Sequence, residues 1–364
     1  MGKETFGFAA YDKSGSHKPI TFQRRDVLAS DIEIEIIYTG VCHSDIHSIR
    51  AEWSDNPPYP LATGHEIVGK VAAVGSDVKK FKVGDFAAVG CMVDSCGTCE
   101  ECKNGMEQFC LNSATFTYGS PLRIEGHGCT EHVTQGGYSK TIVVREQFAL
   151  VVPEKLHDQL AATAPLLCAG ITLWNPLETQ CGRDLSGKKL GIVGLGGLGH
   201  MGVRLGKAMG AHVTVISRSH AKKKEALEGL GADDFVATGV EGELEKVKNS
   251  MDFIIDTVSA KHDLAPLIAC LSFRGKYIVV GAPEKMQEIH NSWFLYKSIS
   301  YSGSLIGGVD QTQRMLDFCA EHGVVCDIEM IGFDQIDKAH ERVLNADVKY
   351  RFVLDVGNYQ VPAN

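Results

Sequence analysis

The sequence has 364 residues, of which 44% are hydrophobic and 22% are charged, and its formal net charge is −9. The length predicts two domains, because one ordinary hydrophobic core rarely serves so long a chain. The acidic charge argues against a nucleic-acid or anionic-membrane partner, since both require a basic surface. No apolar run reaches the roughly 18 residues of a membrane span. The N-terminus also lacks a signal-peptide core, so we expect a cytoplasmic protein.

The first 160 or so residues are expected to form a mostly antiparallel, barrel-like β region. Apolar or alternating runs lie there between turn signals, at Ile32–Tyr38, Glu66–Val74 and Phe86–Cys91.

A dense group of reactive side chains follows the first of these runs, at residues 40–47. Cys42 is a candidate metal ligand. If a helix begins here, Ser44 and His47 share one of its faces, which suits a proton path from a buried metal site to water. The alternative is a helix N-cap at Ser44 with a surface histidine beyond it.

Two further candidate ligands stand at the start of the second run. His65 supplies an imidazole, and Glu66 is a candidate to bind the metal in a resting state or to lie beside it. Asp45 is a candidate to accept the other ring N–H of His65, as carboxylates usually do for zinc-bound histidines. The alternative for His65 is a buried histidine with a purely structural role.

Four of the 12 cysteines share the spacing C-x2-C-x2-C-x7-C: Cys96, Cys99, Cys102 and Cys110. Four thiolates at such short separations enclose Zn²⁺ with no open position, which predicts a structural zinc lobe over residues 91–111. An iron–sulfur cluster is disfavoured, because the fourth cysteine is too distant and no proline follows it. A reducing compartment disfavours disulfides, and the acidic neighbours disfavour a DNA-binding zinc ribbon.

Residues 115–135 are predicted to form a long irregular loop, and such loops are usually functional or disordered. Phe116 and Tyr118 in this loop, with Trp53 upstream, are candidates for an apolar substrate pocket. A variable surface loop and ordinary core packing are the alternatives. Further on, Cys168 is isolated among apolar residues, which by itself is more typical of an inert buried thiol.

The pattern changes near residue 190. A buried strand is predicted at Leu190–Gly194, a helix from there to about Met209, and another strand at Val213–Ile216. This is the context that the GxGxxG dinucleotide fingerprint requires, with the pyrophosphate at the helix N-terminus. The residues of the motif are Gly194, Leu195, Gly196, Gly197, Leu198 and Gly199.

The end of the second strand indicates which cofactor binds. NAD sites carry Asp or Glu there for the ribose 2′-hydroxyl. This chain has Ser217 and Arg218, with Lys222 beyond them. Hydroxyls and cations hold a 2′-phosphate, whereas a carboxylate repels it. We therefore predict NADPH rather than NADH.

The alternation of strands and helices continues to the C-terminus. Strands are predicted at 252–257, 277–281 and 299–302, helices at 262–270 and 312–321, and a last strand at 350–355 that returns to the first domain.

Together these segments resemble the zinc-dependent medium-chain alcohol dehydrogenases, most closely the cinnamyl-alcohol-dehydrogenase-like branch. The resemblance covers nearly the whole chain. It implies an α/β fold in which a GroES-like, mostly-β catalytic domain (residues 1–160 and 303–364) holds an inserted Rossmann domain (residues 161–302) with a doubly wound parallel sheet. It also implies a homodimer. The segments that carry it are Gly40–His47, Gly64–Glu66, the four-cysteine lobe, Pro165–Thr172, Gly194–Gly199 and Tyr350–Asp355.

The resemblance also implies that Cys168 joins Cys42 and His65 as the third ligand of a catalytic zinc. Zn²⁺ would polarise an aldehyde carbonyl, NADPH would deliver hydride, and a relay of Ser44, the cofactor ribose and His47 would supply the proton that the product alkoxide needs. Ile306 is a further candidate for the substrate pocket. The expected activity is reversible reduction of aromatic and medium-chain aldehydes to primary alcohols. The alternative is a C=N or C=C reductase of the same family that acts on a specialised metabolite.

Overall fold

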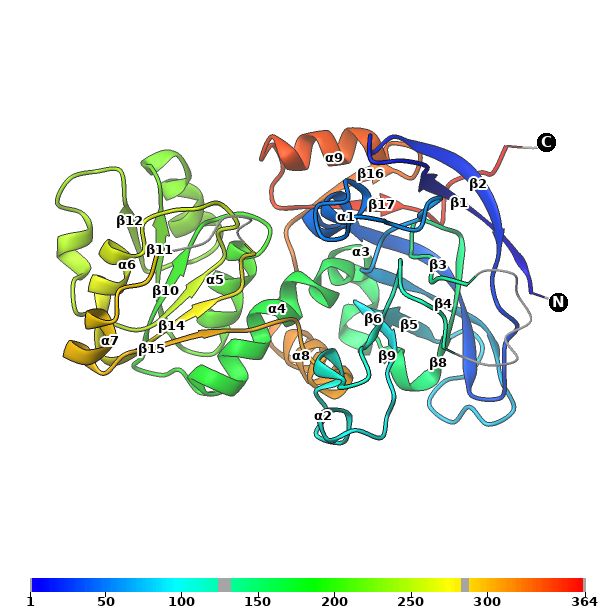
Figure 1. Cartoon of the computed structure of the whole chain (residues 1–364), viewed down its shortest axis with the longest axis horizontal. Coiled ribbons are helices and arrows are strands. Elements are labelled where there is room, and N and C mark those ends of the chain that lie inside the picture. Colours follow the sequence, from blue (N-terminus) through cyan, green and yellow to red (C-terminus); the bar gives the residue numbers. More distant parts are fainter. Residues whose placement is uncertain (1, 124–131, 283–287, 363–364) are drawn as a thin grey trace. The chain divides into compact units, whose positions relative to one another are not determined.

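The structure is a computed structural model of the chain that describes residues 2–123, 132–282 and 288–362 (Figure 1). The chain folds into two compact units, one made of Met1–Cys168 with Gly307–Asn364 and the other of Ala169–Ile306. The second unit is thus inserted into the first. This unit begins eight residues later and ends four residues later than the domain at residues 161–302 that we expected from the sequence.

A seven-stranded sheet forms the centre of the first unit. Its strand order is β16-β17-β3-β4-β5-β9, with β8 also paired to β3, and only the β16–β17 pair is parallel. Two short antiparallel ladders, β1–β2 and β6–β7, complete the β structure of this unit within the described residues. The bounds are β1 Glu4–Ala10, β2 His17–Gln23, β3 Asp31–Val41, β4 Ile67–Val74, β5 Phe86–Val89, β6 Met92–Asp94, β7 Thr115–Phe116, β8 Thr141–Arg145, β9 Leu150–Val151, β16 Ile328–Gly332 and β17 Arg351–Asp355.

Strand β3 organises this sheet, because it pairs with three neighbours. Its isoleucines Ile32, Ile34 and Ile36 are buried, and β-branched side chains suit such a pleated, packed surface. The strand is longer than the predicted run and leads directly into α1. The helices of this unit are α1 His43–Ile49, α2 Glu100–Lys103, α3 Leu160–Thr163, α8 Val309–His322 and α9 Ile336–Leu344.

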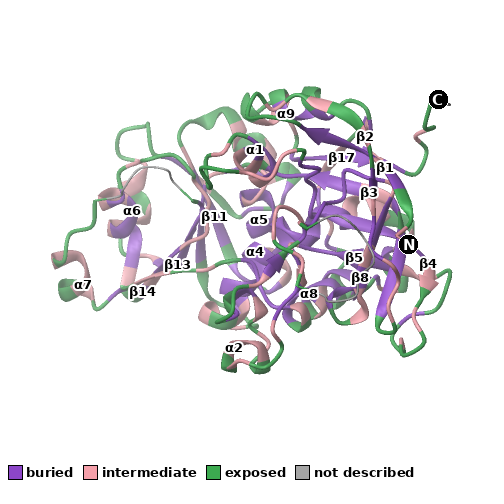
Figure 2. Cartoon of the chain, turned by 45° about the vertical axis from the view of Figure 1, so that its right-hand side comes forward, coloured by how far each residue is buried: buried purple, intermediate pink, exposed green. Residues whose placement is uncertain are grey.

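The second unit is built on a six-stranded parallel sheet in the order β12-β11-β10-β13-β14-β15. This order confirms the predicted doubly wound fold. The strands β11 and β12 are added on one side of β10, and β13, β14 and β15 are added on its other side. Figure 2 shows that buried residues concentrate on the sheet strands. The bounds are β10 Lys189–Val193, β11 His212–Ser217, β12 Asp234–Ala237, β13 Met251–Asp256, β14 Leu271–Val279, β15 Ser300–Gly303, α4 Ala169–Pro176, α5 Gly199–Ala208, α6 Ala265–Cys270 and α7 Ser292–Lys297.

Some elements differ from the sequence-based predictions. The helix predicted from His262 begins only at Ala265, because the Asp263 carboxylate accepts the Ala265 N–H at 2.9 Å and Pro266 stands in the first turn. Strand β12 and helix α9 were not predicted.

The predicted irregular loop at 115–135 was also partly wrong. It contains β7 and an antiparallel bridge between Pro121 and Val133, while its residues 124–131 lie outside the described part of the chain.

No single helix of the described ranges is long and apolar enough to cross a membrane. One bent helix pair, Glu154–Leu167 with Ala169–Cys181, meets the requirement by length and composition alone.

Candidate functional site

Four candidate metal ligands meet inside the first unit. Donor atoms of Cys42, His65, Glu66 and Cys168 all lie within 4.8 Å of one another, and all four residues are buried. The two sulfur atoms are 3.8 Å apart. Thiolates that each lie about 2.3 Å from a tetrahedral zinc are separated by about 3.8 Å. The two cysteines therefore have the separation that a shared zinc ion requires.

The start of α1 positions Cys42. Cys42 is the N-cap residue, its backbone N–H donates to Asp45 Oδ2 at 2.9 Å, and the Asp45 N–H donates to the Cys42 carbonyl at 3.1 Å. These reciprocal bonds fix the turn that brings the thiol to the end of β3. The N-cap alternative for Ser44 is thus wrong, because the cap lies two residues earlier.

The two thiols hold unequal proton affinities. The contact with the Cys168 thiol lowers the pKa of Cys42 well below its usual value, and the same contact raises the pKa of Cys168. Such a pair has one thiolate ready and loses its second proton when a cation binds.

A buried carboxylate orients the histidine of the cluster. Asp45 Oδ1 lies 3.2 Å from His65 Nδ1 and accepts the Gly64 N–H at 3.0 Å, while Oδ2 accepts the Tyr138 hydroxyl at 3.0 Å. With Nδ1 held in this way, Nε2 is the ring nitrogen that remains for a metal. The structure therefore brings Asp45 and His65 together as the sequence led us to expect.

Glu66 is held by a residue that sequence reasoning missed. Its Oε1 forms a buried ion pair with the Arg351 guanidinium, whereas its buried Oε2 has no hydrogen-bond partner among the described residues. Burial raises the pKa of Glu66 well above its usual value, and Arg351 opposes this. A buried oxygen without a partner is costly, so the cluster suits a bound cation. A zinc ion would give this oxygen a partner and would bind the thiolates of Cys42 and Cys168.

Ser44 and His47 lie on α1, as expected. The Ser44 hydroxyl lies 3.5 Å from Cys42 Sγ, and His47 Nδ1 contacts the Glu52 carboxylate. The His47 ring stacks on His43 at 4.7 Å and on Trp53 at 4.9 Å between centroids. Trp53 is 55% exposed, so it covers the histidine rather than a buried pocket.

The other pocket candidates belong to different elements of the chain. The Tyr118 ring lies 5.6 Å from the His65 ring, and Phe116 is 42% exposed at the end of β7. Ile306 belongs to the second unit, where its backbone carbonyl accepts the side-chain N–H of Asn175. Of these residues, only Tyr118 is thus beside the metal-ligand cluster within the first unit.

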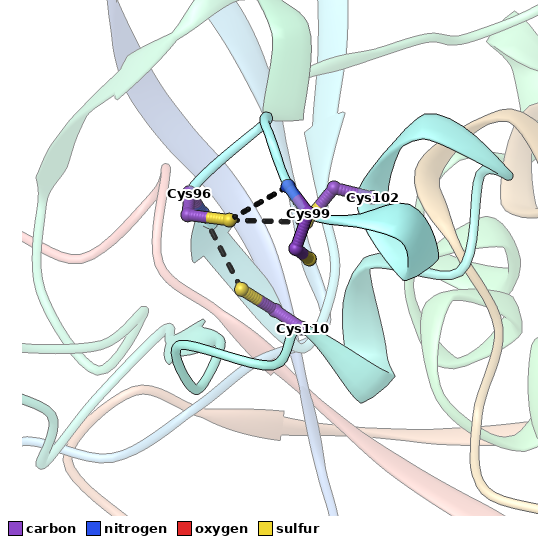
Figure 3. A group of neighbouring side chains, drawn as sticks. All are labelled: Cys96, Cys99, Cys102 and Cys110. Atoms are coloured by element: carbon purple, nitrogen blue, oxygen red, sulfur yellow. Dashed lines mark hydrogen bonds between the residues drawn. The ribbon is translucent and has the colours of Figure 1, made fainter.

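The four clustered cysteines form a second group of candidate ligands (Figure 3). Cys96 Sγ lies 3.9 Å from Cys102 Sγ and accepts the Cys99 N–H at 3.3 Å, while Cys110 Sγ accepts the Cys96 N–H at 3.5 Å. A hydrogen bond from Asn112 is the largest of several that lower the pKa of Cys96 to about 5. The sulfur atoms converge from α2, its preceding loop and the turn after Glu107–Phe109, which is the arrangement of a closed zinc site.

The glycine motif lies between β10 and α5. Gly194 has a φ of +87°, and a side chain at Gly199 would collide with the Gly194 carbonyl, so the turn itself requires both. Around Gly196, in contrast, the described residues leave open space beside the position of a Cβ. Protein packing does not explain that glycine, whereas a dinucleotide approaching the backbone does. Gly197 and Leu198 complete the turn, and Leu198 is the N-cap of α5.

The residues that we assigned to the 2′-phosphate follow β11. Ser217 is its last residue and is partly exposed, and Arg218 is exposed beside it. Lys222 Nζ donates to the carbonyl of Leu195 at 2.7 Å. This bond draws a positive charge to the glycine turn, where an anionic cofactor would bind.

Comparisons with known proteins find matches for both parts of the chain. The profile "Alcohol dehydrogenase GroES-like domain" matches residues 29–154, and "Zinc-binding dehydrogenase" matches residues 197–321. Cinnamyl alcohol dehydrogenase 8 of Arabidopsis thaliana is 45% identical over 362 residues, which cover 100% of this chain and 98% of that protein. Aldehyde reductase YahK of Escherichia coli K12 is 49% identical over 351 residues, which cover 95% of this chain and 96% of that protein. The crystal structure of CAD from Helicobacter pylori complexed with NADP(H) has a TM-score of 0.89 and 37% identity, and covers 99% of this chain and 100% of that one.

Proposed function

The chain belongs to the zinc-dependent alcohol dehydrogenase family, in its cinnamyl-alcohol-dehydrogenase-like branch, and we propose that it reduces aldehydes reversibly to primary alcohols with NADPH. Aromatic and medium-chain aldehydes are the proposed substrates. Cys42, His65 and Cys168 would hold a catalytic Zn²⁺, with Glu66 as an additional ligand in a resting state. The 3.8 Å separation of the two buried sulfur atoms carries this proposal.

When bound, Zn²⁺ supplies a Lewis acid for the carbonyl oxygen and NADPH supplies the hydride. The chain's own residues handle the proton that the product needs. The Ser44 hydroxyl would donate this proton, since it lies beside Cys42 at the cluster. His47 would then restore it, because it lies on the same helix as Ser44 and its Nδ1 contacts the Glu52 carboxylate.

The cofactor preference rests on the end of β11. Ser217 and Arg218 occupy the position where a carboxylate would select NAD, and Lys222 adds a positive charge at the glycine turn. These groups favour a 2′-phosphate. The relative solved with NADP(H) supports the same choice.

A second, structural Zn²⁺ is proposed for Cys96, Cys99, Cys102 and Cys110. Both zinc sites need reduced thiols, so a reducing compartment such as the cytoplasm is part of the proposal.

We also propose that two chains form a homodimer through the edge of the second unit. Strand β15 pairs only with β14 among the described strands, and Phe273, Leu295 and Tyr296 near this edge are 73%, 79% and 83% exposed. A second copy would cover these side chains and the free strand edge.

Metal analysis tests both zinc sites. We expect two zinc ions per chain, one fewer in Cys168→Ser with loss of turnover, and one fewer in Cys102→Ser. A wild-type protein with a single zinc that Cys168→Ser retains would contradict the catalytic site.

A panel of aldehydes with NADPH consumption as the readout tests the reaction. Turnover of aromatic and medium-chain aldehydes is expected, and His47→Ala should slow it by about 10-fold or more and change its pH profile. Turnover of C=N or C=C compounds without any aldehyde reduction would contradict the proposal and favour the alternative reductase.

A further inference from the structure

A line of buried polar side chains continues outward from the candidate metal site in the first unit. The Tyr138 hydroxyl donates to Asp45 Oδ2 at 3.0 Å, and His340 Nε2 lies 3.3 Å from the same hydroxyl. We propose that Tyr138 and His340 are positioning residues of the catalytic zinc site. They hold Asp45, and through Asp45 the ring of His65, in the orientation that zinc binding requires. This inference rests on the proposed function.

The proton positions along this line are determined by its chemistry. Asp45 receives the backbone N–H groups of Cys42 and Gly64, which can only donate, so its carboxylate acts as an acceptor. Tyr138 must therefore give its only hydroxyl proton to Asp45. The hydroxyl oxygen is then free to accept, and the group that faces it is Nε2 of His340.

His340 fits the role of a donor. Burial lowers its pKa to about 4, so its ring is neutral and carries a single proton. The bond to Tyr138 requires this proton on Nε2. Each member of the line thus donates toward the metal site: His340 to Tyr138, Tyr138 to Asp45. Both oxygens of the Asp45 carboxylate thereby accept hydrogen bonds, and Asp45 at the same time orients the ring of His65.

Both positioning residues are anchored to separate parts of the unit. The Tyr138 N–H donates to the Thr63 carbonyl at 2.8 Å, and the Tyr138 carbonyl accepts the Phe8 N–H at 2.9 Å. On α9, the His340 ring packs against the His17 ring at 5.1 Å, and His17 Nδ1 lies 2.6 Å from Asp337 Oδ1. The line therefore has a fixed scaffold at each end, which is what an orienting role needs.

The outer end of the line reaches a cavity of about 250 Å³ that His340 lines together with residues of α1 and α9.

Residues that hydrogen-bond to the metal ligands also affect metal binding. Removing such a residue typically weakens metal affinity by about 10- to 100-fold. We therefore expect the zinc affinity of this site, and not that of the four-cysteine site, to depend on Tyr138 and His340.

Competition with a chromogenic chelator measures this affinity. Tyr138→Phe and His340→Leu should weaken the more easily extracted zinc by about 10-fold or more. His340→Gln, whose amide can still donate to Tyr138, should recover most of the loss. After replacement of the catalytic zinc by Co²⁺, the visible spectrum of Tyr138→Phe should differ from that of the wild type, because the His65 ligand is reoriented.

Tyr277→Phe is the matched control. Tyr277 is also fully buried and donates to a carboxylate, Asp256 Oδ2 at 2.9 Å, but it lies in the second unit. It should leave the zinc affinity unchanged. Equal affinities of Tyr138→Phe and the wild type, or an equal loss in Tyr277→Phe, would overturn the inference alone. A wild type that binds only the four-cysteine zinc would overturn the proposed function with it.

Discussion

Glu66 and Arg351 are 285 positions apart in the chain, yet they form a buried ion pair beside the candidate zinc ligands. Their meeting depends on Gly40, because a side chain there would lie 1.9 Å from Glu66 Oε2. Removing one partner of a buried pair leaves an uncompensated charge, which is strongly destabilising. At the residue scale, three positions from different segments are thus coupled in one small volume.

Gly40→Ala tests this coupling. The added methyl group would push the Glu66 carboxylate away from Arg351, so we expect the free energy of unfolding to fall by about 1–3 kcal/mol. The zinc content of the catalytic site should fall as well. Urea denaturation and metal analysis measure the two effects.

Gly196→Ala is the matched control for that variant. Described residues leave space for its methyl group, so stability and zinc content should hold while NADPH binding weakens. If Gly40→Ala binds zinc and unfolds as the wild type does, the proposed role of Gly40 fails.

Substitution of Ser217 and Arg218 tests the assignment of NADPH as the cofactor, also at the residue scale. Ser217→Asp combined with Arg218→Leu places a carboxylate where the ribose 2′-hydroxyl of NADH would be bound, and removes a positive charge from the 2′-phosphate. We expect the ratio of kcat/KM for NADPH to that for NADH to fall by about 10-fold or more, as a charged contact of 1.4 kcal/mol would give. An unchanged ratio would refute the assignment.

At the scale of elements, the connection between β13 and α6 is the clearest example of structure beyond the strands and helices. His262, which we expected to lie in a helix, instead has Nε2 3.0 Å from Asp256 Oδ2 and Nδ1 2.9 Å from the Ala260 carbonyl. Both partners are acceptors, so the protonated ring satisfies both. The segment that joins β13 to α6 is therefore tied back to the strand.

A pH dependence of stability follows. The hydrogen bond with Asp256 raises the pKa of His262 above its usual 6.5. The stabilisation of the folded protein by protonated His262 is fully present below the pKa that this histidine has in the unfolded chain. It is lost as the pH rises through the higher pKa of the folded state. The melting temperature of the wild type should thus fall above about pH 6.5.

His262→Gln lacks this titration. Between pH 6 and pH 9 its melting temperature should decline less than that of the wild type, by an amount on the order of 2–4 °C. Thermal denaturation followed by circular dichroism gives the comparison. Parallel curves for the two proteins would show that His262 makes no such contribution.

At the scale of the whole molecule, each unit carries its own core. Buried side chains of the parallel sheet, such as Ile254, Leu267 and Tyr277, form one cluster, and the isoleucines of β3 belong to the sheet of the first unit. The candidate zinc ligands all lie in the first unit and the glycine motif lies in the second. The candidate metal ligands and the candidate cofactor-binding turn thus belong to different units of the chain.

Association between chains is tested through the exposed edge of the second unit. Leu295→Glu with Tyr296→Glu places two charges on the proposed interface, where burying them is unfavourable. Light scattering should return a mass near twice 39.5 kDa for the wild type and near 39.5 kDa for the variant. Val83→Glu, at another exposed apolar position, should remain dimeric. A monomeric wild type would contradict the proposed dimer.

The sequence by itself determined the parts of this protein that depend on short spacing. The GxGxxG turn and the four-cysteine lobe each lie within one local segment, so residue type and spacing sufficed to predict them. Periodicity likewise predicted most strands of the parallel sheet. It failed at the start of α6, where the side chain of Asp263 competes with the helical pattern.

Only the tertiary structure decided which distant residues meet. Arg351 reaches Glu66 because β17 pairs with β3, and Tyr138 and His340 reach Asp45 because a loop and α9 pack against α1. Nothing in the spacing of these residues indicates such contacts, since strand pairing and helix packing bring together segments that are remote in the chain. The reactive groups can therefore be identified from the sequence, whereas the buried residues that orient them can be identified only from the folded structure.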